Sequence, residues 1–186
     1  RWPDRSLLEP VLARLAGGLS AEEFLRGVAI ADQLAPPSER KELGEAVQRF
    51  LTRVVDGDVL LVTRQQKQDV LALVVARGFD SNGLRVLDQL ARDRDREVRL
   101  AAHQGLVAAG ADNPRCTELC WRLISDQTSV LDARLEAIVS LAQIEKQMSG
   151  RAWRQLLESQ SDEVALVALR CLRTHADQRE ADRVVE

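Results

Sequence analysis

The sequence predicts an all-α protein made of stacked helical hairpins, and two observations support this. The first is a nine-residue pattern, 98–106, which recurs 35 and then 31 further residues along, at 133–141 and 164–172. A period in the low thirties is typical of α-solenoids, in which each unit is too small to bury its own apolar face. The second is composition. Hydrophobic residues make up 45%, aromatics only 3%, and Tyr is absent, so Leu, Val and Ala must form the core.

The repeated pattern has apolar residues on two sides of a helix. Val98, Ala102 and Leu106 fall on one side at 3.6 residues per turn, and Leu100 and His103 lie roughly opposite. A helix that is apolar on two sides is buried between neighbours. The positions common to all copies are a Leu (Leu100, Leu135, Leu166), an Ala (Ala102, Ala137, Ala168), a small residue (Gly105, Ser140, Cys171) and a final Leu (Leu106, Leu141, Leu172).

The repeats divide the chain into segments of one domain. Apolar residues at helical spacing upstream of each copy predict the first helix of each hairpin: Leu84, Leu87, Leu90; Leu119, Cys120, Leu123; Trp153, Leu156, Leu157. We therefore expect a single solenoid domain over 1–186 with about five helix pairs. Residues 81–175 hold three clear repeats, 1–80 hold divergent helices, and 176–186 form a polar tail.

The divergent segment carries its own helix signals. Ser20-x-x-Glu23 is a capping box. Residues 59–63 are rich in β-branched side chains, but no partner strand is evident, so we interpret them as the entry to a helix. The expected helices are Ser6–Leu15, Ser20 through Leu34, Ser38 to the turn at Asp56, and Val59–Arg77.

Residues 90–102 resemble a HEAT repeat of the armadillo-like superfamily. That family typically carries an Asp in the turn and an Arg six residues later that bond across repeats, and Asp93 and Arg99 match. The second unit matches with two extra residues in the turn, as Asp126 and Arg134. The resemblance covers 81–175 and implies a right-handed α-solenoid. It says almost nothing about activity.

The third unit departs from the family pattern at both positions. Ser159 and Ala165 stand where the Asp and the Arg are expected. Their joint absence avoids a single buried charge without its partner.

Charge and hydropathy exclude several classes of protein. The net charge is 26 − 29 = −3, without the basic excess of a nucleic-acid surface. The longest apolar run, 70–76, is far shorter than the roughly 20 residues of a membrane span.

Three cysteines, an odd number, favour reduced thiols in the cytoplasm. We expect a domain excised from a longer protein, in which residues 1–3 could follow a membrane helix.

Residues capable of chemistry are few. His103 aligns with Ile138 and Leu169, so we interpret it as a buried structural histidine rather than a catalytic one. Cys116 and Cys120, with Cys171 and His175, form two pairs that could each chelate a metal, but their spacing fits no common zinc module. We therefore predict no catalytic residue, cofactor or metal.

The HEAT resemblance suggests three classes of enzyme to compare with this sequence. Metal-dependent hydroxylases of this class bear His-Glu pairs, but Gln104 and Ala176 follow the histidines here. HEAT-like DNA glycosylases have a basic, aromatic groove that this composition does not provide. HEAT-like bilin lyases have only weak sequence motifs, so a bilin-lyase function remains an alternative for this chain.

The remaining sides of the second helices should form a weakly charged surface that suits another protein. We predict a non-enzymatic protein-interaction scaffold, with a soluble regulatory domain of a membrane protein as a further alternative. Trp121 aligns with polar positions and is a second candidate anchor, although a Trp lying flat on a neighbouring helix is the commoner case. The predicted binding residues are Gln104, Glu136, Val139, Gln143, Arg170 and Trp121.

Overall fold

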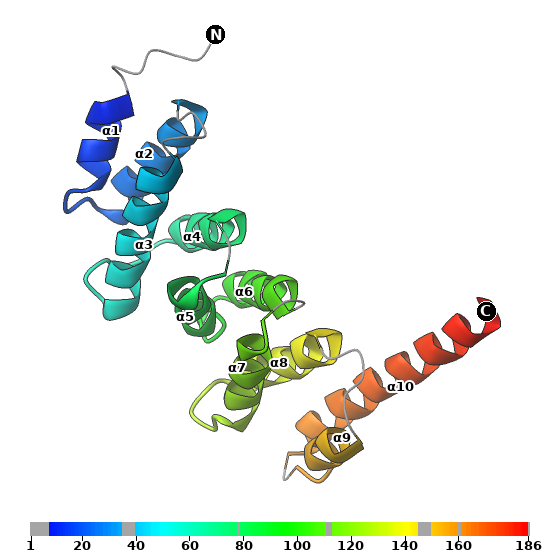
Figure 1. Cartoon of the computed structure of the whole chain (residues 1–186). Helices are drawn as coiled ribbons and strands as arrows, with labels where there is room; N and C mark the ends of the chain where they lie inside the picture. The colour runs from blue at the N-terminus through cyan, green and yellow to red at the C-terminus, as the bar shows by residue number, and fades with distance from the viewer. Residues whose placement is uncertain are drawn as a thin grey trace. The chain divides into compact units, whose positions relative to one another are not determined.

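The protein is all-helical, as predicted. A computed structural model describes residues 8–34, 40–77, 79–110, 113–144, 150–159 and 161–185, with the side chains of Arg40 and of 175–185 excepted. These residues form ten helices and no strand (Figure 1). The helices are α1 (Leu8–Leu15), α2 (Ala21–Leu34), α3 (Arg40–Asp56), α4 (Arg64–Arg77), α5 (Ser81–Leu90), α6 (Arg96–Gly110), α7 (Arg115–Ser125), α8 (Leu131–Ile144), α9 (Gly150–Leu157) and α10 (Asp162–Val185).

The chain divides into two compact units. Unit 1 is Arg1–Leu90 and contains α1 to α5; unit 2 is Ala91–Glu186 and contains α6 to α10. The boundary falls inside the first predicted repeat, whose two helices were expected at α5 and α6. That one domain spans 1–186 stays a prediction.

Unit 1 contains the divergent helices, and their starts follow the sequence signals. The capping box at Ser20 is confirmed: Ser20 N–H donates to Glu23 Oε2 at 3.1 Å, and Glu23 N–H donates to Ser20 Oγ at 3.4 Å. Helices α1 and α3 both pack on α2, and the stacked rings of Phe24 and Phe50 lie 4.0 Å apart between α2 and α3. The predicted cap at Ser38 lies outside the described residues.

The helix expected at Val59–Arg77 begins five residues later than predicted. Residues 59–63 are not helical, and α4 starts at Arg64. The start is fixed by a second capping box: Gln66 N–H donates to Thr63 Oγ1 at 3.1 Å, and Thr63 N–H donates to Gln66 Oε1 at 3.2 Å. Thr-x-x-Gln is a capping-box sequence. The sequence interpretation placed the helix start at the β-branched run, residues 59–63, and did not use this capping-box signal.

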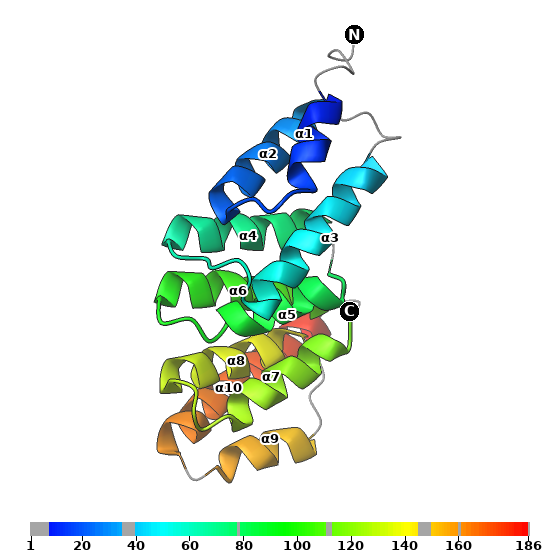
Figure 2. The same cartoon turned by 90° about the vertical axis from the view of Figure 1, so that its left-hand side faces the viewer.

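Unit 2 is built from helices that pack in succession. Helix α7 pairs with α8, and α9 pairs with α10. Helix α6 packs on α8 and α8 packs on α10, so the three second helices follow one another within the unit (Figure 2). This matches the prediction that the three copies of the repeated pattern are neighbours.

One feature of the predicted core is wrong. The shared Leu of the pattern is not buried: Leu100 and Leu166 are exposed, and Leu135 is only half-buried. The Ala of the pattern is buried in all three copies, at Ala102, Ala137 and Ala168. Each second helix therefore buries a narrower arc than its pattern predicts, and the first Leu of the pattern is exposed or half-buried.

Candidate functional site

The residues predicted to bind a partner lie on the three second helices of unit 2. Gln104 on α6, Val139 and Gln143 on α8, and Arg170 on α10 are all exposed, and Val139 keeps 40% of its surface accessible. Gln104, Val139 and Arg170 occupy the same position of the repeated pattern. Because α6, α8 and α10 pack in succession, these side chains follow one another across the unit. We call this set the strip.

Leu100 extends the strip and was not among the predicted binding residues. It lies one turn before Gln104 on the same side of α6 and is 37% exposed. The sequence assigned Leu100 to the core because it is apolar and recurs in every copy. Its exposure adds an apolar group to the strip beside Val139.

Glu136 was also predicted to bind a partner, but its side chain forms an ion pair within the fold. Its side chain is only 14% exposed. Arg99 Nε donates to Glu136 Oε2 at 2.9 Å, and Arg99 Nη2 donates to Oε1 at 3.3 Å. This two-pronged pairing is the strongest geometry available to Arg and a carboxylate. Glu136 therefore joins α8 to α6.

Arg99 is the central polar residue of the α6–α8 contact. Its side chain is almost fully buried, and Nη1 donates to the backbone carbonyls of Asp93 at 3.1 Å and Arg94 at 3.2 Å. Nη2 also lies 3.5 Å from the Asp132 carboxylate. Arg99 thus bonds across repeats, as the HEAT resemblance implies. It pairs with the carboxylates of Glu136 and Asp132, on the following second helix.

Asp93 folds the turn, and the cap of α6 comes from Asp95. Asp93 Oδ1 accepts a hydrogen bond from Asp95 N–H at 2.8 Å, and Asp95 Oδ1 accepts one from Glu97 N–H at 2.9 Å. Since α6 begins at Arg96, Asp95 stands at the N-cap. We expected Asp93 either to cap this helix or to bond across to the next repeat, and the cap lies two residues later, at Asp95.

The second predicted pair, Asp126 and Arg134, acts through other groups. Arg92 Nη1 donates to Asp126 Oδ2, and Arg92 Nη1 also donates to Ser129 Oγ at 3.0 Å. The Thr128 hydroxyl, then that of Ser129, and finally the Arg92 charge hold the pKa of Asp126 well below its usual range. Arg134 Nε donates to the Ile124 carbonyl at 2.9 Å. Asp126 thus connects its turn to the preceding one.

His103 is buried, as predicted, in the same α6–α8 interface. Ser140 Oγ lies 3.0 Å from His103 Nδ1 and donates its hydrogen to the Glu136 carbonyl at 3.1 Å. Nε2 is buried with no hydrogen-bond partner among the described residues, and Glu136 Oε2 is 3.9 Å away. Burial first, and the Arg99 charge second, lower the pKa of His103 to about 4.

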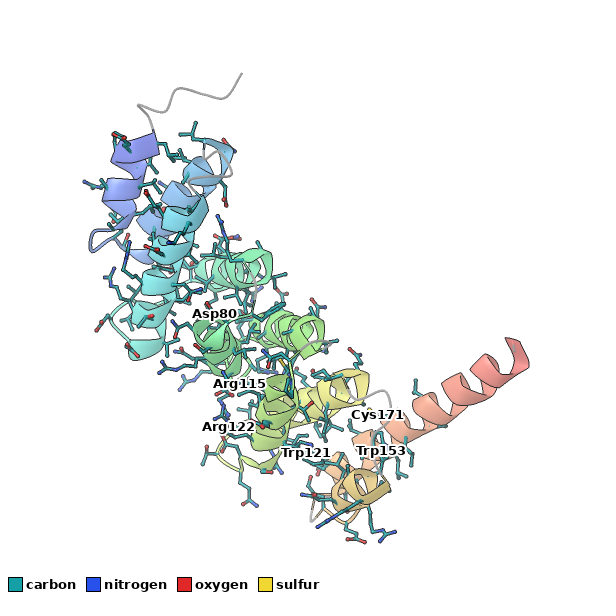
Figure 3. The ribbon with its side chains drawn as sticks, in the orientation of Figure 1. Asp80, Arg115, Trp121, Arg122, Trp153 and Cys171 are labelled. Carbon is teal, nitrogen blue, oxygen red and sulfur yellow. The ribbon has the colours of Figure 1, made fainter. Side chains whose placement is uncertain are left out.

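None of the three cysteines forms a disulfide among the described residues. Cys116 and Cys120 are buried on α7. Cys171 is half-buried on α10 (Figure 3). Burial raises the pKa of Cys116 to about 11 and raises that of Cys171. Among the described side chains, which do not include His175, no three His, Cys, Asp or Glu residues are placed to hold a metal ion.

Trp121 lies on α7 (Figure 3) and is half-buried rather than freely exposed. Trp153, on α9, is buried. Trp121 therefore offers part of its indole to a partner from the first-helix side of the hairpin, on a different helix from those of the strip.

Unit 1 holds two concavities that the sequence did not indicate. A pocket of about 710 Å³ lies between α2 and α4, with Leu25 and Leu73 beside Gln66 and Asp69 in its walls. A largely apolar groove of about 420 Å³ lies between α1 and α2, where Val11, Leu19 and Ile30 contribute. Their walls combine residues distant in sequence, so periodicity alone could not locate them.

No protein-family model, curated protein or solved structure matches this chain. No helix of the described residues is both long and apolar enough to cross a membrane. Function is therefore inferred from the residues and their geometry.

Proposed function

We propose that the protein is a non-enzymatic interaction scaffold, a right-handed α-solenoid of HEAT-like repeats that binds a protein partner. The partner binds on the strip of Gln104, Val139, Gln143 and Arg170, extended by Leu100. The observation that carries the proposal is the strip itself: exposed side chains at equivalent positions of three helices that pack in succession. Glu136 is left out, because Arg99 holds it inside the fold.

The chemistry of the strip suits a protein better than a phosphate backbone. Two apolar side chains, Leu100 and Val139, stand beside two amides and one cation. Amides can pair with the main chain of an extended segment or with polar residues of a helix, and the apolar groups supply contact area. A single arginine cannot produce the steep salt dependence of binding to several phosphates.

The side chains of His103 and Cys116 are not placed for catalysis, and this supports a scaffold. His103 is neutral at pH 7, buried between α6 and α8, and bonded to Ser140. The Cys116 thiol is buried, and its raised pKa keeps it protonated. General-base and nucleophilic catalysis both need a group within reach of a substrate. Neither side chain meets that requirement.

The test uses the chain as bait to identify a partner by pull-down, followed by direct binding measurements. Val139→Glu combined with Gln143→Lys places charges at the centre of the strip, and we expect affinity to fall at least about tenfold, or 1.4 kcal/mol. The matched control is Val130→Glu, at an exposed Val in the turn before α8 and off the strip. The control should bind like the parent.

Two outcomes would overturn the proposal. If the folded double variant binds as tightly as the parent, the strip is not the site, and the surface around Trp121 becomes the next candidate. If affinity falls by orders of magnitude between low and moderate salt, the surface recognises phosphate or another dense charge. Circular dichroism of each variant checks that the helices persist.

A further inference from the structure

The last second helix, α10, exposes Leu169, whose equivalents on the two helices before it are buried. His103 on α6 is buried against Ser140 of α8 and is only 4% exposed. Ile138, the equivalent residue on α8, is fully buried in a helix that packs on α10. Leu169 is the equivalent on α10 and is 51% exposed, with Leu166 at 50%. No described helix covers this face.

The exposed leucines belong to a stripe with charges at its ends. Asp162, Leu166, Leu169 and Arg173 are spaced by four, three and four residues. That spacing places all four within an arc of about 60° on one side of α10. It is the spacing of a coiled-coil seam, which predicts that this side of α10 packs along another helix. Asp162 and Arg173 are both exposed, like the leucines between them.

The stripe is complementary to itself when two copies run antiparallel. Leu166 of one copy then lies opposite Leu169 of the other, and the same alignment sets Asp162 opposite Arg173. All four positions are matched at once, because each pair sums to 335 (162 + 173 and 166 + 169). A two-fold interface requires this kind of self-matching surface. A parallel arrangement would instead oppose Asp to Asp and Arg to Arg.

We propose that a second copy of this chain docks on α10, antiparallel, through Asp162, Leu166, Leu169 and Arg173. The apolar pair excludes water at the centre, and the two ion pairs fix alignment and direction. The contact area is small, so the association is weak, reversible and dependent on concentration. The contact uses Leu169, on the side of α10 equivalent to the side of α8 that carries Ile138, and Leu166, which lies one turn before Arg170 of the strip. It does not require the strip to bind a partner.

Sedimentation equilibrium of the chain over micromolar to about 1 mM concentrations tests the proposal. The parent should show a reversible monomer–dimer equilibrium. Leu169→Glu opposes a carboxylate to Leu166 of the other copy and should weaken the dimer at least tenfold. Leu60→Glu is the matched control, since it adds the same charge at a strongly exposed Leu of unit 1. It should leave the dimer unchanged.

Charge reversal tests the alignment. Asp162→Arg leaves arginine at both ends of the stripe, and Arg173→Asp leaves aspartate at both ends, so each variant alone should dimerise several-fold more weakly than the parent. An equimolar mixture of the two variants should form a heterodimer, because every end pair is again of opposite charge. This result does not depend on any cost that Asp162→Arg imposes on the start of α10, since that cost is the same in both samples.

Three results would overturn the proposal. The parent could remain monomeric at the highest concentration, Leu169→Glu could dimerise as well as the parent, or the mixed variants could fail to associate while each stays helical by circular dichroism. A parent that is monomeric but captures a different protein through Leu169 would show that another helix occupies this face, which also contradicts self-association.

Discussion

Two successive contacts in unit 2 each join one second helix to the next, but their chemistry differs. Between α6 and α8, a buried Arg99 pairs with Glu136, and His103 bonds Ser140. Between α8 and α10, the equivalent of Arg99 is Arg134, which donates to the Ile124 carbonyl instead, the equivalent of Glu136 is Val167, and the equivalent of His103 is Ile138. The buried residues there are Ile138, Val164 and Ala168. One contact is held by directed polar bonds and the other by close apolar packing.

The difference shows how one repeated pattern can specify which neighbour goes where. An apolar face accepts any apolar face of suitable shape, whereas a buried Arg with four acceptors admits only a partner that supplies them. Breaking the polar contact should therefore cost more than trimming the apolar one, because a buried charge loses its partner.

Arg99→Met should destabilise unit 2 by about 3–5 kcal/mol, the usual cost of breaking a buried ion pair on one side. It leaves the Glu136 carboxylate and the carbonyls of Asp93 and Arg94 without this donor. Urea denaturation followed by circular dichroism measures the loss.

Two comparison variants sharpen that result. Arg99→Met combined with Glu136→Met removes both charges and should recover much of the loss. Ile138→Val trims the apolar contact and should cost only about 0.5–1.5 kcal/mol. If Arg99→Met costs less than Ile138→Val, the polar contact does not control the stability of the unit.

His103 should make the stability of the α6–α8 contact dependent on pH. Its pKa is about 4 in the folded chain, below the 6.5 of a solvated histidine, so the unfolded chain binds more protons between these values. Stability should therefore fall as pH drops from about 6.5 to about 4, by up to about 3 kcal/mol.

His103→Leu is the matched variant, because Leu169 occupies this position in α10. Its stability should change less than the parent's across the same pH window, while the carboxylates contribute equally to both proteins. Denaturation midpoints at several pH values give the difference between the two. Parallel pH curves for parent and variant would show that His103 is already solvated or protonated in the folded state.

Asp95→Ala should cost about 0.5–2 kcal/mol, since it removes the side chain that caps α6. Asp93→Ala should cost less, because Asp93 Oδ1 accepts from the Asp95 N–H in the turn, whereas Asp95 Oδ1 accepts from the Glu97 N–H in the first turn of the helix. Thermal unfolding of the two variants ranks them. The reverse order would return the main role to Asp93, as the HEAT resemblance implies.

Sequence periodicity predicted the helices well where helix signals are local. The all-α class, the capping box at Ser20 and the succession of the three repeated helices all follow from spacing and caps. That Arg99 bonds across repeats was expected from the resemblance, but its partners on α8 were not. Caps and helical spacing depend on residues a few positions apart, and the repeats on a regular period, both of which one sequence displays directly.

The rest depended on which side of each helix meets its neighbour. Leu100 and Leu166 look like core residues by type, yet they face solvent, because packing on α8 uses the side of α6 that carries His103. Glu136 looked like a surface residue because its repeat equivalents are Ala101 and Val167. Its tie to Arg99 follows from the distance between two helices, which periodicity does not contain.

The distribution of the indoles has a spectroscopic consequence. Two of the three tryptophans, Trp121 and Trp153, belong to unit 2, the chain has no tyrosine, and Trp2 is the only indole before residue 90. In a Trp2→Phe variant, ultraviolet-excited emission would come from unit 2 alone, while far-ultraviolet ellipticity would sum both units. Melting the variant with both signals recorded together would show whether the two halves of the chain unfold as one cooperative body or in separate steps.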